Sequence, residues 1–355
     1  MTGVGSRDFS TSRLERRRAL GRLGGAVAVA TGLGIVWGAW FGRRRRRTWV
    51  DGDRWSASHQ LPNAGAPVAP APGTRLEFTP IERHYRIDID TRLPAIDGDA
   101  WRLKIAGLVE QPIEMTLLEI RRMEPLHQFI TLSCISNLVG GDLISTTRWT
   151  GVSLRALLPR LRLGASATHL KITSADGFAE VIEIATIVAD ERVMLAYAWD
   201  DVPLPIEHGF PLRLYMPDRY GMKQPKWIQT IDALDHWEAG YWVERGWDRE
   251  GHVRSTCAID AIVADPKRVT GDGRLLTAIG GIAHAGVRGI SKVEVRIDGG
   301  DWQPADLRTP LSETAWVVWR SDLPLQAGEH IATVRCYEGD GTRQTSTTHT
   351  RRAKI

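Results

Sequence analysis

The chain has 355 residues, of which 43% are hydrophobic and 25% are charged, so it is long enough to fold into two or three domains. Its three widely separated cysteines exclude a disulfide framework. The net charge of +4 is unevenly distributed, because residues 1–50 hold 11 arginines against 2 acidic residues and the remainder is acidic. A basic terminal segment on an acidic body favours a membrane surface as partner, and no nucleic acid is expected.

Residues 1–50 form a basic N-terminus around nineteen uncharged residues, 23–41. This run is long enough to cross a bilayer as one helix, with Trp37 and Trp40 suited to an interface. The alternative is a cleaved signal, since "RRRALGRLGG" is similar to a twin-arginine export signal. Because five arginines, and no small-residue cleavage site, follow the run, we expect a retained single-pass anchor in the cell membrane. The body of the chain is expected outside the cytoplasm, because the "RRRAL" stretch resembles a signal that exports folded proteins.

Residues 51–80 are rich in proline and alanine, which predicts a semi-extended linker. Residues 81–250 mix strand-like runs with short helix-like runs and so indicate an α+β domain. A capping-box spacing from Thr116 to Glu119 predicts a helix start, and a second helix is expected in 153–161, ended early by Pro159. The expected strands are 101–109, 128–133, 169–174, 179–184, 193–199 and 212–216.

Residues 251–355 differ in texture from the segment before them. Strand-like runs alternate with glycine-rich turns at 298–300 and 339–341, which predicts an immunoglobulin-like antiparallel β-sandwich. The segment holds no cluster of catalytic residue types, so its expected role is packing or dimerisation. Its expected strands are 275–285, 291–297, 315–320 and 330–338.

Cys134 ends the apolar run of the 128–133 strand, in the stretch "TLSCISNLVGGDLISTTRW". A lone cysteine in this position is usually a small buried hydrophobe. Here polar neighbours and the pair Gly140-Gly141 favour the other interpretation, a thiolate ligand for a soft metal with room for a bulky group. A single cysteine cannot hold a metal alone, so the other ligands would have to come from a cofactor.

Several ordered motifs together resemble the sulfite oxidase family of molybdopterin enzymes. They are the cysteine loop "LSCISN", the segment "HGFPLRLYMPDRYGMKQPKWI" at 208–228, and "GYWVERGWD" after it. The resemblance implies a sulfite-oxidase-type molybdopterin-binding domain over 81–250, followed by the sandwich, with one N-terminal transmembrane helix. It also implies that Cys134 binds the molybdenum of a single-pterin, bis-oxo cofactor. No haem is expected, since the chain has no CxxCH segment.

The resemblance carries specific residues over to this chain. The cofactor's phosphate and pterin need cationic donors and close backbone approach, which the 208–228 segment offers. The expected cofactor-binding residues are Asn137, Arg148, His208, Arg213, Gly221, Lys223 and Lys226. Around the metal, Cys134 is expected to be catalytic together with Arg86 of "HYRID" and Trp247.

Two departures bear on the substrate. Sulfite oxidases have an arginine five residues after the cysteine, where this chain has Val139, and a tyrosine where it has Trp247. A pocket with fewer donors binds a small dianion weakly, so the expected reaction is oxygen-atom transfer to a sulfur compound other than sulfite. An S-oxide reductase of the methionine-sulfoxide type is the alternative, and a metal-free tethered binding protein is a second. The expected partners are a small sulfur-containing substrate, a separate electron carrier (a cytochrome, quinone or membrane haem protein), the membrane and a second copy of the chain.

Overall fold

The computed structural model describes residues 60–355, and the predicted anchor at 23–41 lies outside them. Within the described range, no helix is both long and apolar enough for a membrane span. The described chain is mostly β-sheet, with three short α-helices and four 3-10 turns, so the predicted α+β class applies only in a limited sense. The helices are α2 (Leu117–Arg121), α3 (Leu154–Leu161) and α4 (Ile184–Ala189), and the 3-10 turns are η1 (Ile81–Arg83), η2 (Ile206–His208), η3 (Gly221–Lys223) and η4 (Val243–Arg245).

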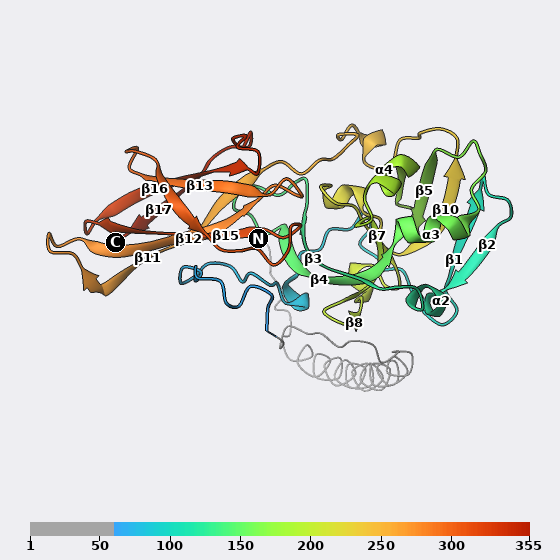
Figure 1. Cartoon of the computed structure of the whole chain (residues 1–355), viewed down its shortest axis with the longest axis horizontal. Coiled ribbons are helices and arrows are strands. Elements are labelled where there is room, and N and C mark those ends of the chain that lie inside the picture. The colour runs from blue at the N-terminus through green and yellow to red at the C-terminus, as the bar shows by residue number, and fades with distance from the viewer. Residues whose placement is uncertain (1–59) are drawn as a thin grey trace, which may run out of the picture. The chain divides into compact units, whose positions relative to one another are not determined.

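Two five-stranded sheets form the region before residue 250 (Figure 1). In the first sheet, the order is β2-β1-β10-β5-β6, and only β1 and β10 run parallel. Its strands are β1 (Arg102–Gly107), β2 (Ile113–Thr116), β5 (His169–Ser174), β6 (Ala179–Glu183) and β10 (Ile228–Leu234). The capping box predicted at Thr116 is confirmed, since Thr116 and Glu119 exchange both cap hydrogen bonds at the start of α2.

The second sheet positions the residues singled out by the sequence. Its order is β3-β4-β7-β8, with β9 paired to β7, and all its pairs are antiparallel. Its strands are β3 (Leu126–Ser133), β4 (Ile144–Ser153), β7 (Met194–Trp199), β8 (Val202–Pro203) and β9 (Arg213–Tyr215). Trp149 of β4 and Trp199 of β7 are fully buried and pack with Tyr215 of β9 in one core. That core fixes the end of β3, where Cys134 follows, and the start of β9, where Arg213 stands.

The C-terminal strands form an antiparallel array in the order β11-β12-β15-β14-β13-β16-β17. Their bounds are β11 (Thr256–Val269), β12 (Leu275–His284), β13 (Ile290–Ile297), β14 (Gln303–Leu307), β15 (Val317–Leu325), β16 (Glu329–Glu338) and β17 (His349–Lys354). Apolar residues from both ends of the array meet in one core, with Cys257 and Trp319 facing Val293 and Cys336. The array therefore folds over on itself as two layers, whereas its assignment to the immunoglobulin-like class stays a prediction.

Helix α3 continues to Leu161, so the prediction that Pro159 ends it early was wrong. Leu154, Leu157 and Leu161 repeat at helical spacing and are buried. Their burial stabilises the helix by more than the cost of the one hydrogen bond that proline cannot donate. The helix ends at Arg162, whose positive φ of 46° stops the helical path.

Residues 60–80, within the predicted linker, have no regular strand or helix but pack against the sandwich. The carboxylate of Glu77 is buried and accepts hydrogen bonds from Arg308 Nε at 2.9 Å and from Asn63 Nδ2 at 2.5 Å. Arg308 also donates to the carbonyl oxygens of Val68 and Asn63. This part of the proline- and alanine-rich segment thus belongs to the folded body.

We expect Arg308→Met to lower the free energy of unfolding by about 3–5 kcal/mol, because it leaves the buried Glu77 carboxylate without its counter-ion. The side chains of this pair are only 10% and 7% exposed. Arg320→Met is the control, since Arg320 and Asp322 form a more exposed pair on the same sandwich and its removal costs about 1 kcal/mol or less. Urea denaturation measures the free energy of unfolding of both variants. Equal losses in Arg308→Met and Arg320→Met would show that burial of the Glu77–Arg308 pair adds nothing to its contribution.

Candidate functional site

The loop after β3 holds Cys134 by backbone hydrogen bonds at both ends. Cys134 N donates to the carbonyl oxygen of Leu143 at 2.9 Å, and Asn137 N donates to the carbonyl oxygen of Cys134 at 3.1 Å. Asn137 closes the loop, because its Oδ1 accepts from Leu143 N at 2.9 Å. A Cβ on Gly141 would lie 2.7 Å from that oxygen, so the turn requires glycine there. The thiol is thereby fixed at the strand end.

Cys134 lies on the wall of a cavity that gathers residues from segments far apart in the sequence. Seven of the ten predicted site residues line it: Cys134, Arg86, Trp247, His208, Arg213, Gly221 and Lys226. Gly221 leaves room in the wall, since a Cβ there would lie 2.8 Å from the hydroxyl oxygen of Tyr85. The structure therefore brings together most of the residues that the sequence motifs singled out, whereas their roles stay predictions.

Arg213 is buried in this cavity without a carboxylate partner among the described residues. Its guanidinium lies over the rings of Trp149 and Trp199, at 4.6 and 5.1 Å from the centroids. Nη1 donates to the carbonyl oxygen of His208 at 2.9 Å, but the buried Nε has no hydrogen-bond partner. Burial lowers the pKa of Arg213 to about 10, because the loss of water around the charge outweighs the opposing effects of Tyr85 and Asp88.

His208 and Lys226 share this electropositive environment. Burial, with Arg213 and Lys226 nearby, lowers the pKa of His208 to about 3, so its ring is neutral at physiological pH. Burial likewise lowers the pKa of Lys226 to about 8, against the opposing effect of its hydrogen bond to Asp88. Asp88 also pairs with Arg86, so one carboxylate is shared between two cations.

Three predicted cofactor residues do not line the cavity. Asn137 closes the cysteine loop as described, and Arg148 Nη1 pairs with Asp201 Oδ1 at 2.7 Å. Lys223 Nζ pairs with the buried Glu180 Oε1 at 2.6 Å. In this structure the three side chains therefore stabilise the surroundings of the cavity, and Val139 is not part of its lining either.

Sequence reasoning missed several residues of the lining, namely Tyr85, Asp88, Asp176, Phe178 and Trp242. Two signals were available: Tyr85 and Asp88 flank Arg86, and Trp242 stands in the same "GYWVERGWD" as Trp247. Phe178, Tyr241, Trp242 and Trp247 form a chain of neighbouring rings, with successive centroids 5.6, 5.2 and 6.0 Å apart. Burial raises the pKa of the Asp176 carboxyl, an acid that only the fold places here.

These residues fit an anionic cofactor that supplies its own metal ligands. The orphaned Nε of Arg213 and the lowered pKa values of Arg213 and Lys226 describe cations that a phosphate or other anion would compensate. His208 offers a neutral ring nitrogen to a polar ring system, and Cys134 offers the soft ligand. The donor set therefore fits a pterin-bound metal with one protein thiol as a ligand.

Comparisons with known proteins agree with the fold and with a molybdopterin-binding domain. Residues 90–242 match the family described as oxidoreductase molybdopterin binding domain. A protein of Azospira oryzae named "Putative protein-methionine-sulfoxide reductase subunit YedZ1" is 28% identical over 187 residues, 53% of this chain and 68% of that protein. Human mitochondrial sulfite oxidase is 26% identical over 287 residues, which cover 69% of this chain.

The crystal structure of the sulfane dehydrogenase SoxCD from Paracoccus pantotrophus has the same fold. It matches with a TM-score of 0.64 at 22% identity, over 75% of this chain and 74% of that chain. The chain spans about half the length of the sulfite oxidases it matches, 53% for the human protein.

Fold and site together define a molybdopterin-binding protein with a single cysteine in its cavity. Residues 90–242 match the molybdopterin-binding domain of oxidoreductases, and the chain is similar to the sulfite oxidases over 69% of its length.

Arg213→Met should move stability and cofactor content in opposite directions. The apoprotein should gain roughly 1–2 kcal/mol of unfolding free energy, because a buried, uncompensated charge is replaced by an apolar chain. Pterin content per chain should fall, since the lost donors cost the bound anion about 2–4 kcal/mol. Denaturation of the apoprotein and fluorescence of released pterin measure the two effects, with the exposed Arg155→Met as control. Unchanged pterin occupancy at low enzyme concentration would count against the assignment.

Proposed function

We propose that this protein is a molybdopterin-dependent oxidoreductase that catalyses two-electron oxygen-atom transfer on a small sulfur compound other than sulfite. The observation that carries the proposal is the joint position of the Cys134 thiol and the uncompensated cation Arg213 on one cavity wall. In the oxidative direction, a sulfur centre and water give an S-oxide, two protons and two electrons. The reductive direction is the reverse.

Each residue of the wall has an expected task toward the cofactor. When bound, molybdopterin supplies a redox-active metal that carries the oxygen-atom transfer. Cys134 Sγ would hold that metal, while Arg213 and Lys226 would bind the anionic parts of the cofactor and neutral His208 would donate or accept one hydrogen bond. Trp149 and Trp199 keep water from the guanidinium of Arg213 and so strengthen its attraction to an anion.

Two features of the cavity support a substrate less charged than sulfite. Arg86, which matches an arginine that faces the substrate in sulfite oxidases, is engaged by Asp88. Trp242 and Trp247 contribute apolar surface to the wall, and Trp247 is 39% exposed. A carboxylate beside the expected substrate arginine repels a dianion, and flat aromatic rings bind larger sulfur compounds.

Reduction of an S-oxide is the second candidate function. The observation that favours it is the similarity to the Azospira oryzae protein, whose printed name is that of a methionine-sulfoxide reductase subunit. A tethered binding protein without metal is a third possibility of a different class. Molybdenum content of the purified protein separates the last candidate from the first two.

Cys134→Ser should abolish turnover while the chain still folds. The hydroxyl is nearly isosteric with the thiol, but it is a harder and far less acidic ligand, so the soft metal loses its protein thiolate. Steady-state assays with an artificial electron carrier measure the loss, and circular dichroism checks the fold. Turnover near that of the wild type would show that Cys134 is not the ligand.

Sulfite should be a poor substrate of the wild-type protein. Asp88→Asn should raise kcat/KM for sulfite about tenfold. Sulfite is largely anionic at neutral pH, and freeing Arg86 from Asp88 restores one charge-assisted hydrogen bond worth about 1.5–3 kcal/mol. The test compares sulfite with neutral S-oxides in the two directions, using Asp90→Asn as the matched control. If sulfite gives by far the highest efficiency in the wild type, the argument from the cavity fails.

We also propose that residues 23–41 anchor the protein, with its body outside the cytoplasm and its electrons passing to a separate membrane haem protein, cytochrome or quinone. The support is the charge pattern of residues 1–50 and the similarity of "RRRAL" to an export signal. The full-length chain should remain in membranes washed with carbonate, and added protease should reach it in intact right-side-out cells or spheroplasts. Release by carbonate would refute the anchor, and full protection from protease would refute the sidedness.

A further inference from the structure

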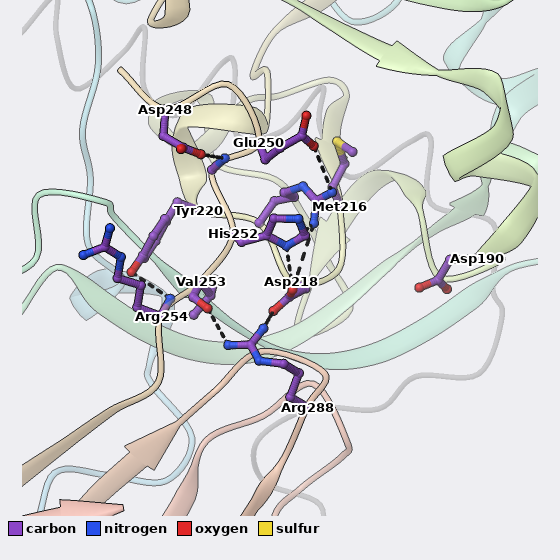
Figure 2. Close-up of polar contacts among 12 residues, drawn as sticks. Asp190, Met216, Asp218, Tyr220, Asp248, Glu250, His252, Val253, Arg254 and Arg288 are labelled. Atoms are coloured by element: carbon purple, nitrogen blue, oxygen red, sulfur yellow. Dashed lines mark hydrogen bonds and ion pairs between the residues drawn. The ribbon is translucent and has the colours of Figure 1, made fainter. Parts of the chain in front are cut away.

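One arginine of the sandwich, Arg288, contacts Asp218 and Val253 (Figure 2). Its Nη1 donates to Asp218 Oδ1, and its Nη2 donates to the carbonyl oxygen of Val253 at 2.6 Å. Its Nε donates to Glu338 Oε2 at 2.7 Å, on β16. All three guanidinium nitrogens are used, so one side chain joins the sandwich to two other segments.

Asp218 occupies a position that few residues tolerate. Its φ of 58° is left-handed, which aspartate accepts better than most residues that carry a Cβ. His252 Nδ1 lies 2.8 Å from the second carboxylate oxygen, Oδ2 (Figure 2). On the sandwich side, a Cβ on Gly286 would lie 2.1 Å from Oδ1, so glycine is required for the carboxylate to approach. The geometry on both sides is therefore adapted to the contact between Asp218 and Arg288.

Backbone hydrogen bonds connect the segments of Asp218 and Val253 to the residues that line the cavity. Val253 N donates to the carbonyl oxygen of Asp218 at 3.1 Å, and Tyr220 N donates to that of Gly251 at 2.8 Å. The hydroxyl of Tyr220 accepts from Arg254 N at 3.0 Å (Figure 2). Gly221 follows Tyr220 directly and lines the cavity, as do Met222, Gln224 and Lys226.

We propose that Arg288 is a positioning residue for the cofactor, although it lies outside the cavity lining. By fixing Asp218, it holds the short segment 218–226 in the conformation that presents Gly221 and Lys226 to the bound pterin. This gives the sandwich a task in cofactor retention beyond packing. The inference rests on the proposed function, because it assumes that the cavity binds molybdopterin.

The test measures the rate at which pterin leaves the purified, cofactor-loaded, full-length protein after dilution. Arg288→Met should release pterin about tenfold faster than the wild type, and Asp218→Ala should act alike. Asp218→Asn should stay within about twofold, because asparagine keeps the acceptor and tolerates positive φ. The double variant Asp218→Ala/Arg288→Met should be no faster than either single one, since both remove the same contact. Arg274→Met is the control, because Arg274 forms an exposed pair with Asp272 on the same sandwich.

Two outcomes would overturn the inference. The first is that Arg288→Met releases pterin no faster than the control Arg274→Met. The second is that the double variant releases pterin at a rate increased by the product of the two single effects, those of Asp218→Ala and Arg288→Met. If Arg288→Met does not fold, Arg288→Lys serves instead. It keeps the charge but cannot reach three acceptors, and it should release pterin at least threefold faster. A wild-type protein that contains neither molybdenum nor pterin would overturn the proposed function and this inference together. Normal pterin content with unchanged release in the variants would overturn the inference alone.

Discussion

A buried guanidinium without a counter-ion among the described residues is the constraint on which the cavity depends. Arg213 lies over the rings of two buried tryptophans, and its Nε makes no hydrogen bond. Burying such a charge opposes folding, so the rest of the structure has to stabilise it through the core of β4, β7 and β9. The arrangement favours an anion in the cavity, because an anion would convert an unfavourable buried charge into a compensated one.

The same constraint explains why several ionisable groups around Arg213 depart from their ordinary pKa values. His208 and Lys226 both titrate well below their usual range, since each is desolvated and close to another cation. Asp88 is placed where it can pair with two cations at once. Binding sites often contain groups with such perturbed pKa values, because the ligand supplies the charge or hydrogen-bond partner that the protein itself does not provide.

The sequence predicted the parts of the site that have a local signature. Cys134 ends an apolar strand, and His208, Arg213, Gly221 and Lys226 stand within one short segment, so spacing and resemblance were sufficient. Strand β4 was missed because nine of its ten residues are buried, which removes the alternation of a half-exposed strand. Arg148 and Lys223 were predicted to bind the cofactor from the resemblance and from their charge, whereas their ion-pair partners, Asp201 and Glu180, are more than forty residues away in sequence. Only the fold makes such pairs visible.

The cysteine loop has a neighbour at the far end of the chain. A Cβ on Gly140 would lie 2.5 Å from His349 Nε2, and His349 Nδ1 accepts a hydrogen bond from Ile259 N at 2.9 Å. His349 opens β17, more than 200 residues after Gly140 in the sequence. A strand of the sandwich therefore forms part of the surroundings of the cysteine loop, and a change in the packing of β17 is transmitted to the loop that carries the thiol.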